Sequence, residues 1–467
     1  MSEVAASPIA PRADLLDRLV SLAKQRGLVF QSSEIYGGVN AVYDYGPLGV
    51  RIRRNIRNRW WRSVVELRDD VEGIETSIIM NSRVWEASGH VGGFTDPLVD
   101  CLGSCRRRWR ADHLETERSA RGKDASLHLC PECDGALGEE RRFNLMFKTF
   151  LGPVEDAAAQ VYLRPETAQG MFVNFQNVLQ ATRRRLPLGI AQNGRSFRNE
   201  ISPGNFIFRL REFEQCELEF FCKPGTDDGW FEHWTGERFR WYVEDLGVRR
   251  SQLRLRPHEK DELAHYAKAA SDVEYLYPFG WGELEGIANR TDFDLRQHQQ
   301  HSGKDLSYFD TETNERWLPY VIEPAVGVDR ILITVLCDAY DEEEVNGEKR
   351  VVLRLHPDVA PVQVAVLPLS KKPELSQVAR RVEHDLRRRF ATSYDETQAI
   401  GRRYRRQDEI GTPLCVTVDF ETLTDDAVTI RERDGMTQVR VPLAGLVTAI
   451  GEQLEASRAR ALDRARG

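Results

Sequence analysis

The chain has 467 residues, of which 41% are hydrophobic and 30% charged, a balance typical of folded globular proteins. Its formal net charge of −8 excludes a protein that coats nucleic acid through a uniformly basic surface, so any nucleic-acid contact must be local. No run of about 18 apolar residues is present, and residues 1–12 lack the apolar stretch of a signal peptide. We therefore expect a cytoplasmic protein without a membrane segment.

The N-terminal part predicts two helices and a strand. Apolar residues recur at helical spacing from Ala13 to Gly27 and from Leu48 to Leu67, and Val71 to Met80 has the composition of a strand. From about 95 to 156 the sequence changes character, with paired cysteines, an arginine run and a polar stretch. This change indicates an insertion.

Strand patterns dominate the middle of the chain. A helix expected from Arg164 to Leu179 precedes two long strands between Gly189 and Lys223. A mixed segment at about 224–272 is expected to be a second insertion, and Tyr320 to Tyr340 predicts a strand, a turn and an apolar helix. Runs of strands with helices between them, many in hairpins, favour an α+β core with an antiparallel sheet flanked by helices.

A domain boundary is predicted where two prolines interrupt the pattern, at His356 to Pro361. Residues 358–467 then alternate between strands and helices in the manner of a small α/β domain. The chain therefore divides into a first domain, 1–357, and a C-terminal domain, 358–467.

The segment from Ser196 to Phe221 carries the most chemical information. With the period of a strand, one face of its second half presents two cations, an aromatic ring, an amide and two carboxylates: Arg209, Arg211, Phe213, Gln215, Glu217 and Glu219. A hairpin with a solvated charged face would account for this composition equally well. The pattern alone leaves both interpretations open.

Phe197 to Glu200 (FRNE), a loop and then Arg209 to Glu217 resemble the second signature motif of class II aminoacyl-tRNA synthetases. The resemblance implies that Arg198 holds the α-phosphate of ATP, that Phe213 stacks on adenine, and that Glu200 and Arg209 belong to the same ATP site. The chemistry fits, because negative charge grows on the α-phosphoryl group as the adenylate forms and a guanidinium fork stabilises it.

The stretch EPAVGVDRILITVL, Glu323 to Leu336, resembles the third class II motif. That motif implies that Arg330, in the first turn of the predicted helix, holds the γ-phosphate, and a helix N-terminus already favours an anion. An ordinary helix start with a surface arginine is the alternative. Glu285, in the preceding segment GELEGIANRTDFDL, is a candidate ligand for the Mg²⁺ that accompanies ATP.

Residues Leu48 to Met80 are similar to the first class II motif, a helix and strand at the interface of a homodimer. The proline usual in this motif is absent, and Ser77 stands near its place. Burial of the helix and strand within one chain is the alternative interpretation.

Several segments resemble the glycyl branch of class II, among them SSEIYGGVNAVYDYGPLG, RPETAQG and ELEGIANRTDFDL. This branch implies ATP-dependent activation of glycine to glycyl-adenylate and transfer to the 3′ end of tRNA-Gly. Its amino-acid pocket corresponds here to three glutamates, an arginine and an alanine: Glu166, Glu217, Glu323, Arg290 and Ala325. The glutamates would surround the ammonium group and Arg290 the carboxylate side, and Ala325 replaces the serine usual in the family.

Two other functions are compatible with parts of this pattern. A catalytically inactive, synthetase-like subunit that binds tRNA or other nucleic acid would keep the fold, but the intact Arg198, Phe213 and Arg330 disfavour it. A class II synthetase for another small amino acid, such as proline or threonine, is disfavoured by the set of three glutamates.

Four cysteines form two pairs, Cys101 with Cys105 and Cys130 with Cys133, separated by 24 residues. In a reducing compartment this spacing favours a tetrahedral zinc site over disulfides, and four thiolates would make the zinc structural. A site without metal, or one in which His113 or His128 replaces a cysteine, remains an alternative.

Arginine-rich runs occur at 106–110, 183–185, 387–389 and 402–406. Such runs are commonly solvated helix faces. The C-terminal domain is similar to the anticodon-binding domains of the family, in which local positive charge meets phosphates and bases stack on aromatic side chains. Tyr404 is the candidate for stacking.

Overall fold

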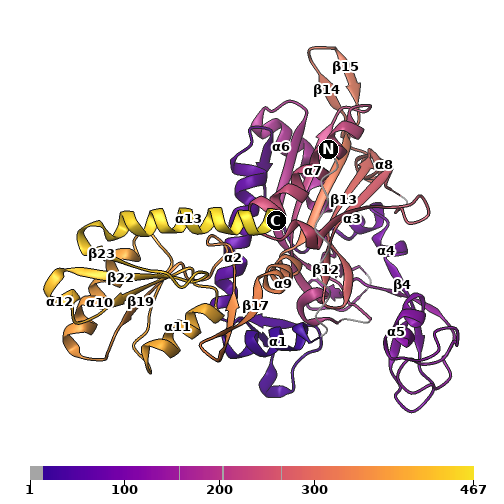
Figure 1. Cartoon of the computed structure of the whole chain (residues 1–467). Helices are drawn as coiled ribbons and strands as arrows, with labels where there is room; N and C mark the ends of the chain where they lie inside the picture. Colours follow the sequence, from indigo (N-terminus) through magenta and orange to yellow (C-terminus); the bar gives the residue numbers. More distant parts are fainter. Residues whose placement is uncertain (1–13, 157, 202–203, 265) are drawn as a thin grey trace, which may run out of the picture.

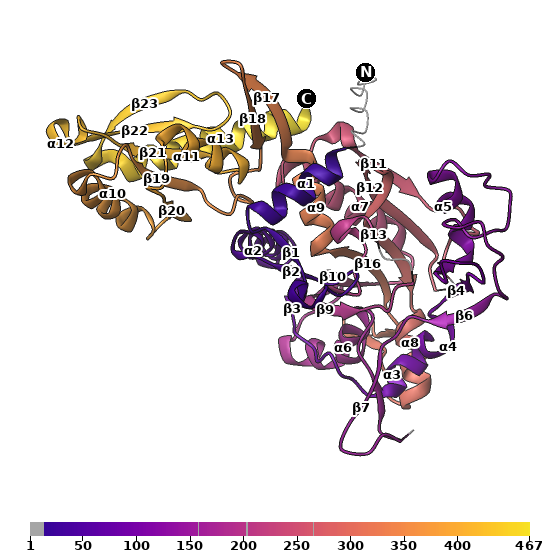
Figure 2. The same ribbon diagram turned by 90° about the horizontal axis from the view of Figure 1, so that it is seen from below.

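The computed structural model describes residues 14–156, 158–201, 204–264 and 266–467 (Figure 1). Most of the N-terminal tail therefore lies outside the described residues. No helix within them is long and apolar enough to cross a membrane. A C-terminal domain and a cysteine-bearing insertion extend from opposite sides of a central sheet (Figures 1 and 2).

The central sheet has seven strands and confirms the antiparallel α+β prediction. Neighbouring strands are antiparallel, except that the edge strand β3 runs parallel to β9. In spatial order the strands are β11 (Leu253–Pro257), β12 (Ala269–Tyr277), β13 (Gly280–Thr291), β16 (Tyr320–Gly327), β10 (Glu212–Cys222), β9 (Leu188–Phe197) and β3 (Val71–Gly73).

Helices cover both faces of this sheet, so its central strands are buried on both sides. Phe220 of β10 packs on Trp230 and Trp234 of α7 (Asp227–Glu244), whereas the adjacent Phe221 packs on Phe172 and Phe175 of α6 (Ala168–Thr182). The apolar helix α9 (Val328–Ala339) follows β16 directly, as the pattern from Tyr320 to Tyr340 predicts. Alternation along β10 thus assigns neighbouring side chains to different layers.

The N-terminal helices form as predicted, but the strand after them is shorter. The helices are α1 (Leu15–Gln25) and α2 (Pro47–Trp61), and α2 continues into a π-helical turn at Arg62–Glu66. The strand expected from Val71 to Met80 ends at Gly73. Beyond it, Thr76 bonds to side chains instead of a neighbouring strand. Its backbone N–H donates to Oε1 of Gln192, and its backbone oxygen accepts from the guanidinium of Arg164.

The segment at 224–272, which the sequence predicts to be a second insertion, is built into the central domain. It supplies α7, whose Trp234 and Trp241 enter the main hydrophobic core, and the strands β11 and β12 at one edge of the central sheet. The charged composition of α7 on its outer side concealed this role, because the buried face of a helix occupies only part of its surface.

The helices α3 (Ser82–Ala87) and α4 (His90–Gly93) lead into the segment at 95–156, which has a sheet of its own. That sheet comprises β4 (Thr95–Asp100), β5 (Arg108–Arg110) and β6 (Arg141–Asn144), with helix α5 (Leu114–Ala120) beside it. The remaining short elements around the central sheet are β1 (Val29–Gln31), β2 (Tyr43–Tyr45), β7 (Lys148–Phe150), β8 (Gln160–Tyr162), α8 (Phe293–Ser302), β14 (Tyr308–Asp310) and β15 (Glu315–Trp317).

The C-terminal domain contains a five-stranded sheet packed between helices. Its strands, in spatial order, are β20 (Thr392–Tyr394), β19 (Val364–Pro368), β21 (Leu414–Val418), β22 (Ala427–Glu432) and β23 (Gln438–Pro442). Its helices are α10 (Pro373–Leu386), α11 (Ile400–Glu409), α12 (Thr422–Asp425) and α13 (Leu446–Arg466). A hairpin of β17 (Tyr340–Val345) and β18 (Glu348–Leu353) joins it to the first domain, and buried Arg350 of β18 bonds to Asp408 of α11.

Candidate active site

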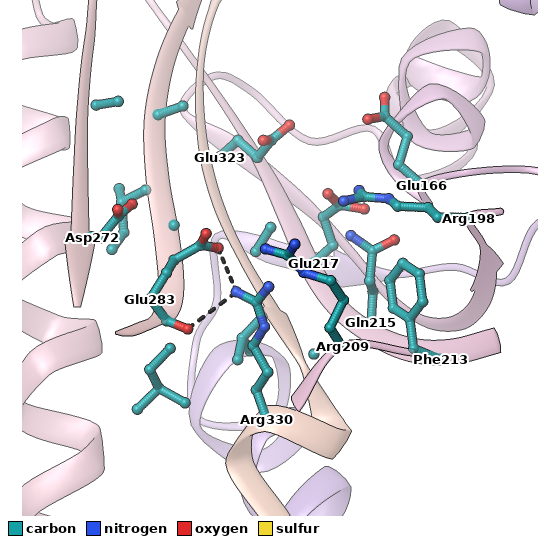
Figure 3. Close-up of a pocket in the computed structure, with 18 of the residues that line it drawn as sticks. Glu166, Arg198, Arg209, Phe213, Gln215, Glu217, Asp272, Glu283, Glu323 and Arg330 are labelled. Carbon is teal, nitrogen blue, oxygen red and sulfur yellow. Dashed lines mark hydrogen bonds and ion pairs between the residues drawn. The ribbon is translucent and has the colours of Figure 1, made fainter. Parts of the chain in front are cut away.

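A cavity of about 320 Å³ opens on one face of the central sheet, where β13, β16 and β10 lie side by side. Predicted site residues from three separate parts of the chain meet in it (Figure 3): Glu166, Arg198, Glu200, Arg209, Phe213, Glu217, Glu323, Ala325 and Arg330. The sheet therefore brings together residues more than 150 positions apart. Arg211, which the period-two pattern placed on the same face, instead donates to the backbone oxygens of Asn40 and Glu200.

Three carboxylates line the inner end of the cavity. Glu217 on β10 lies directly opposite Ala325 on β16, and Glu323 is two residues before Ala325 on that strand. Glu166 comes from the segment just before α6. The absence of a larger side chain at Ala325 leaves the space beside Glu217 open.

Glu217 is a buried acid with few compensating contacts. Its side chain is only 2% exposed and receives hydrogen bonds from the backbone N–H and the hydroxyl of Thr167. Burial, followed by the neighbouring charges of Glu323 and Glu166, raises the pKa of Glu217 to about 8. A cation placed among these carboxylates would favour their ionised forms.

Glu323 is held by Arg290. Burial raises the pKa of Glu323 to about 7, although the Arg290 guanidinium opposes the shift. Arg290 donates to Glu323 at 2.6 Å and forms two further bonds of 2.8 and 2.9 Å to Asp294. All three nitrogens of its guanidinium are thus engaged with protein carboxylates. Arg290 supports Glu323 from behind and is not among the residues that line the cavity, which differs from the expected place beside a substrate carboxylate.

Glu166 remains ionised in the same environment. Burial opposes ionisation, but the charges of His90 and Arg290 and hydrogen bonds from His90 and Gln169 hold the pKa of Glu166 well below its usual range. Gln169 donates to its Oε1 at 3.0 Å, and the Nε2 of His90 lies 3.3 Å from its Oε2. The cluster therefore combines one permanent anion with two acids of raised pKa.

At the outer end of the cavity, Arg198 lies between two aromatic rings. Its guanidinium carbon is 5.2 Å from the ring centre of Phe213 and 5.4 Å from that of Phe94, and its Nε donates to the backbone oxygen of Pro165. Among the described residues no hydrogen bond is formed by the two terminal nitrogens, and the guanidinium points into the cavity (Figure 3). This is the arrangement expected of an arginine that receives a phosphate.

Arg330 faces the cavity from the first turn of α9 and is paired with Glu283. The ion pair measures 2.8 Å, and Arg330 also donates to the backbone oxygen of Glu283 at 3.1 Å (Figure 3). Its guanidinium carbon lies 4.8 Å from the ring centre of Phe208. A cation and a carboxylate are therefore presented together at the mouth of the site.

The structure places Glu283, and not Glu285, in the cavity. A β-bulge leaves Leu284 without a partner on β12, because Glu274 pairs with Glu283 while Val273 pairs with Glu285. The extra residue turns the two glutamates to opposite faces of the sheet. Glu285 is fully buried against α7, where it accepts hydrogen bonds from Arg238 and Tyr242. Glu285 therefore does not reach the cavity in which a magnesium ligand was expected, and Glu283 is the glutamate of this strand that lines it.

Sequence reasoning also missed the residues that hold the carboxylates in place: Thr167, Gln169, His90 and Asp294. The first two follow directly after Glu166 in RPETAQG, so the motif contained a signal for them. His90 lies 76 residues before Glu166 in the chain, and nothing in the local pattern connects the two.

The four paired cysteines converge in the insertion. Their sulfur atoms all lie within 4.8 Å of one another, with Cys101 Sγ 3.5 Å from Cys133 Sγ and Cys105 Sγ 3.4 Å from Cys130 Sγ. No disulfide joins them. Within the described residues, neither His113 nor His128 belongs to this group. Sulfur atoms around a zinc ion at ~2.3 Å stand about 3.8 Å apart, so the four thiols fit such an ion.

Tyr404 does not stand free for base stacking. Its hydroxyl bonds to Thr417, and the guanidinium carbon of Arg431 lies 4.8 Å from its ring centre. In the arginine run at 402–406, which contains Tyr404, the side chain of Arg403 is buried, with 1% exposed, and donates to the backbone oxygen of Leu369. By contrast, the run at 387–389 is exposed at the end of α10.

Comparison with known families agrees with this geometry. Residues 150–339 match the tRNA synthetase class II core domain (G, H, P, S and T), and residues 363–453 match the anticodon binding domain. The glycine–tRNA ligase of Thermobifida fusca (strain YX) is 53% identical over 461 residues, covering 96% of this chain and 99% of the relative. The glycine–tRNA ligase of Bifidobacterium longum (strain NCC 2705) is 55% identical over 462 residues, covering 95% and 94%.

Among solved structures, Giardia lamblia prolyl-tRNA synthetase in complex with prolyl-adenylate is similar in fold. The TM-score is 0.69 at 16% sequence identity, and the match covers 98% of this chain and 82% of the other. This similarity extends through both the sheet domain and the C-terminal domain.

Proposed function

The chain belongs to the glycine–tRNA ligases of class II, and from that premise we propose that the cavity on its central sheet is the place where glycine and ATP react. The protein is an aminoacyl-tRNA ligase whose substrates are glycine and tRNA-Gly. The observation that carries the proposed location is the meeting of a three-glutamate cluster with two cavity-facing arginines in one cavity.

We assign the ATP contacts to the outer end of the cavity. The terminal nitrogens of Arg198 are placed to bind the α-phosphate, and the ring of Phe213 beside it is placed to stack on adenine. Arg330 is placed to bind the γ-phosphate, with Glu200 and Arg209 completing the lining. In adenylate formation the glycine carboxylate attacks the α-phosphorus and pyrophosphate leaves. Arg198 stabilises the added negative charge, so catalysis rests on positioning and electrostatics.

Glycine would bind at the inner end, with its ammonium group among Glu166, Glu217 and Glu323. A buried cation needs such partners, and the cation in turn lowers the cost of ionising two acids whose pKa values are raised. No amino acid is smaller than glycine, so exclusion of a methyl group by the crowded carboxylates suffices for selectivity. Ala325 leaves room for a water molecule in place of the serine hydroxyl of relatives.

Two metals fit the residues present. Glu283 is the carboxylate placed to hold Mg²⁺ at the phosphates, where the ion would neutralise their charge. Cys101, Cys105, Cys130 and Cys133 would hold a structural zinc ion, which leaves no open position for catalysis. A reducing cytoplasm, the proposed compartment, keeps such thiols available.

Two surfaces are proposed for macromolecular partners. The exposed arginines 387–389 of the C-terminal domain replace Tyr404 as the candidate contact to the anticodon stem of tRNA-Gly, because cations bind phosphates independently of base sequence.

For the homodimer, the segment after β3 and the outer face of α6 present Ile79 and Val173, which are 41% and 36% exposed. An apolar surface of this kind favours a second copy of the chain.

The test of the site is amino-acid-dependent exchange of pyrophosphate into ATP, measured separately with glycine, alanine, serine and proline. Charging of tRNA-Gly is measured afterwards. We expect exchange with glycine alone, and loss of exchange when Arg198 or Glu217 is replaced. Full exchange in both variants would contradict the proposed location while leaving the family unchanged.

A further inference from the structure

His90 lies behind the glutamate proposed to bind the substrate ammonium group. It begins α4, the four-residue helix that leads into the insertion. Its Nε2 is 3.3 Å from Glu166 Oε2, and its Nδ1 is 2.8 Å from the hydroxyl oxygen of Ser88. The imidazole thus links a buried serine to a carboxylate of the cavity.

The position of this imidazole is fixed from several sides. The backbone before it turns at Gly89, whose φ of +82° suits glycine. Asn144, at the far end of the insertion, donates to the backbone oxygens of His90 and Val91 at 3.0 Å each. The ring packs edge-on against Trp85 at 5.5 Å and lies 5.2 Å from Phe94. With 11% of its side chain exposed, His90 has little freedom to move.

The contact with Ser88 bears on which ring nitrogen of His90 carries a proton. The hydroxyl of Ser88 has one proton, and its contact with His90 Nδ1 at 2.8 Å is much shorter than its contact with the Trp85 oxygen at 3.4 Å. If that proton goes to Nδ1, the neutral ring carries its own proton on Nε2, which faces Glu166. The ring is then a donor to the carboxylate.

Each carboxylate oxygen of Glu166 consequently has one nitrogen of a neighbouring side chain close to it. Gln169 donates to Oε1 at 3.0 Å, and His90 faces Oε2. A neighbour at each oxygen restricts the orientation of this carboxylate, which lines the cavity. A carboxylate held in this way loses little freedom when a cation arrives, which favours binding.

We propose that His90 is a positioning residue for glycine: supported by Ser88, it holds the carboxylate of Glu166 in the orientation that receives the substrate ammonium group. The inference rests on the role proposed above for Glu166. It concerns glycine and not ATP, because His90 is separated from the phosphate end of the cavity by Phe94 and Arg198.

The experiment compares His90→Gln with His90→Met in pyrophosphate exchange. Glutamine and methionine have similar length and volume, and only glutamine offers an N–H near the place of Nε2. We expect His90→Met to raise the KM for glycine about tenfold, the scale of one hydrogen bond to a charged group, while the KM for ATP and kcat change less than about twofold. His90→Gln is expected to recover most of the loss, and Ser88→Ala to raise the KM for glycine about threefold.

His301→Ala serves as a matched control, since His301 is exposed and does not line the active-site cavity, and its Nδ1 contacts the backbone oxygen of Gln297 in its own helix. The double variant Glu166→Gln/His90→Met is expected to bind glycine no more weakly than Glu166→Gln alone, because His90 acts through Glu166.

The outcomes separate the two proposals. An unchanged KM for glycine in Glu166→Gln would overturn the role of Glu166 itself. If Glu166→Gln raises that KM but the glutamine and methionine variants of His90 behave alike, or raise the KM for ATP equally, His90 is only a packing residue and the inference is overturned. Should His90→Met fail to fold, the Ser88→Ala variant decides, and an unchanged KM for glycine in that variant would overturn the inference.

Discussion

Replacement of Glu217 by glutamine tests the centre of the glycine site. Glu217 is 2% exposed, and its pKa is raised to about 8 chiefly by burial. The amide keeps the size of the side chain and cannot become an anion. We expect the KM for glycine to rise at least tenfold at pH 8, because a hydrogen bond between charged groups contributes ~1.5 to 3 kcal/mol.

The same substitution should stabilise the protein at neutral pH. In the unfolded chain the carboxyl ionises near its ordinary value of 4.5, whereas in the fold it ionises near 8. Below about pH 4.5 both states are protonated and the effect is absent. Between pH 4.5 and about 8 the carboxyl is ionised in the unfolded state and protonated in the folded state, so the free energy of unfolding falls as the pH rises. At pH 7 the cost is ~3 kcal/mol, from about 2.5 pH units at 1.36 kcal/mol each. Glutamine removes this cost.

Glycine binding should also depend on pH in the parent enzyme. Glu217 must lose its proton to pair with the ammonium group, so the KM for glycine is expected to fall as pH rises from 6 to 8. In Glu217→Gln the dependence should be shallower, with the remaining slope arising from Glu323, whose pKa is about 7.

The measurements are glycine-dependent pyrophosphate exchange between pH 6 and 8.5 and thermal unfolding followed by circular dichroism. Glu212→Gln is the control, because Glu212 lies on the same strand, is paired with Arg195 and does not line the cavity. An unchanged KM for glycine together with a lowered Tm would refute the reasoning, since it would mean that Glu217 serves the fold and not the substrate.

Three further outcomes are expected. Arg198→Ala should reduce exchange at least 100-fold with an unchanged circular dichroism spectrum, and exchange near the parent rate would remove its assigned phosphate contact. Cys133→Ser should lose about one equivalent of zinc per chain by elemental analysis and make the insertion sensitive to protease, whereas parent protein that lacks metal when purified without chelator would contradict the zinc site. Glu283→Gln should raise the Mg²⁺ concentration for half-maximal activity about tenfold. Glu285→Ala should instead lower the free energy of unfolding, measured in denaturant, by ~3 to 5 kcal/mol, because Arg238 is left as a buried unpaired charge. If Glu285→Ala changes the Mg²⁺ requirement and Glu283→Gln does not, Glu285 is the metal ligand.

The sequence by itself determined the elements whose signals are local. The strand, turn and helix from Tyr320 to Tyr340 form as predicted because apolar periodicity and Gly327 specify them within a few residues. The alternation along β10 correctly directed Phe213 and Glu217 to one face, since strand geometry fixes the side of every second residue. The convergence of the four cysteines agrees with their paired spacing.

The tertiary structure decided which of two similar residues reaches the site. Glu283 and Glu285 have the same parity in the chain, and only the pairing of β13 with β12 creates the bulge that separates them. Arg290 faces Asp294 and Glu323 because the neighbouring strand and helix place both carboxylates against it. His90 lies beside Glu166 in a position that Asn144, more than 50 residues away in the chain, helps to hold. Hydrogen-bond partners and burial are properties of distant segments brought into contact, and local sequence periodicity carries no information about them.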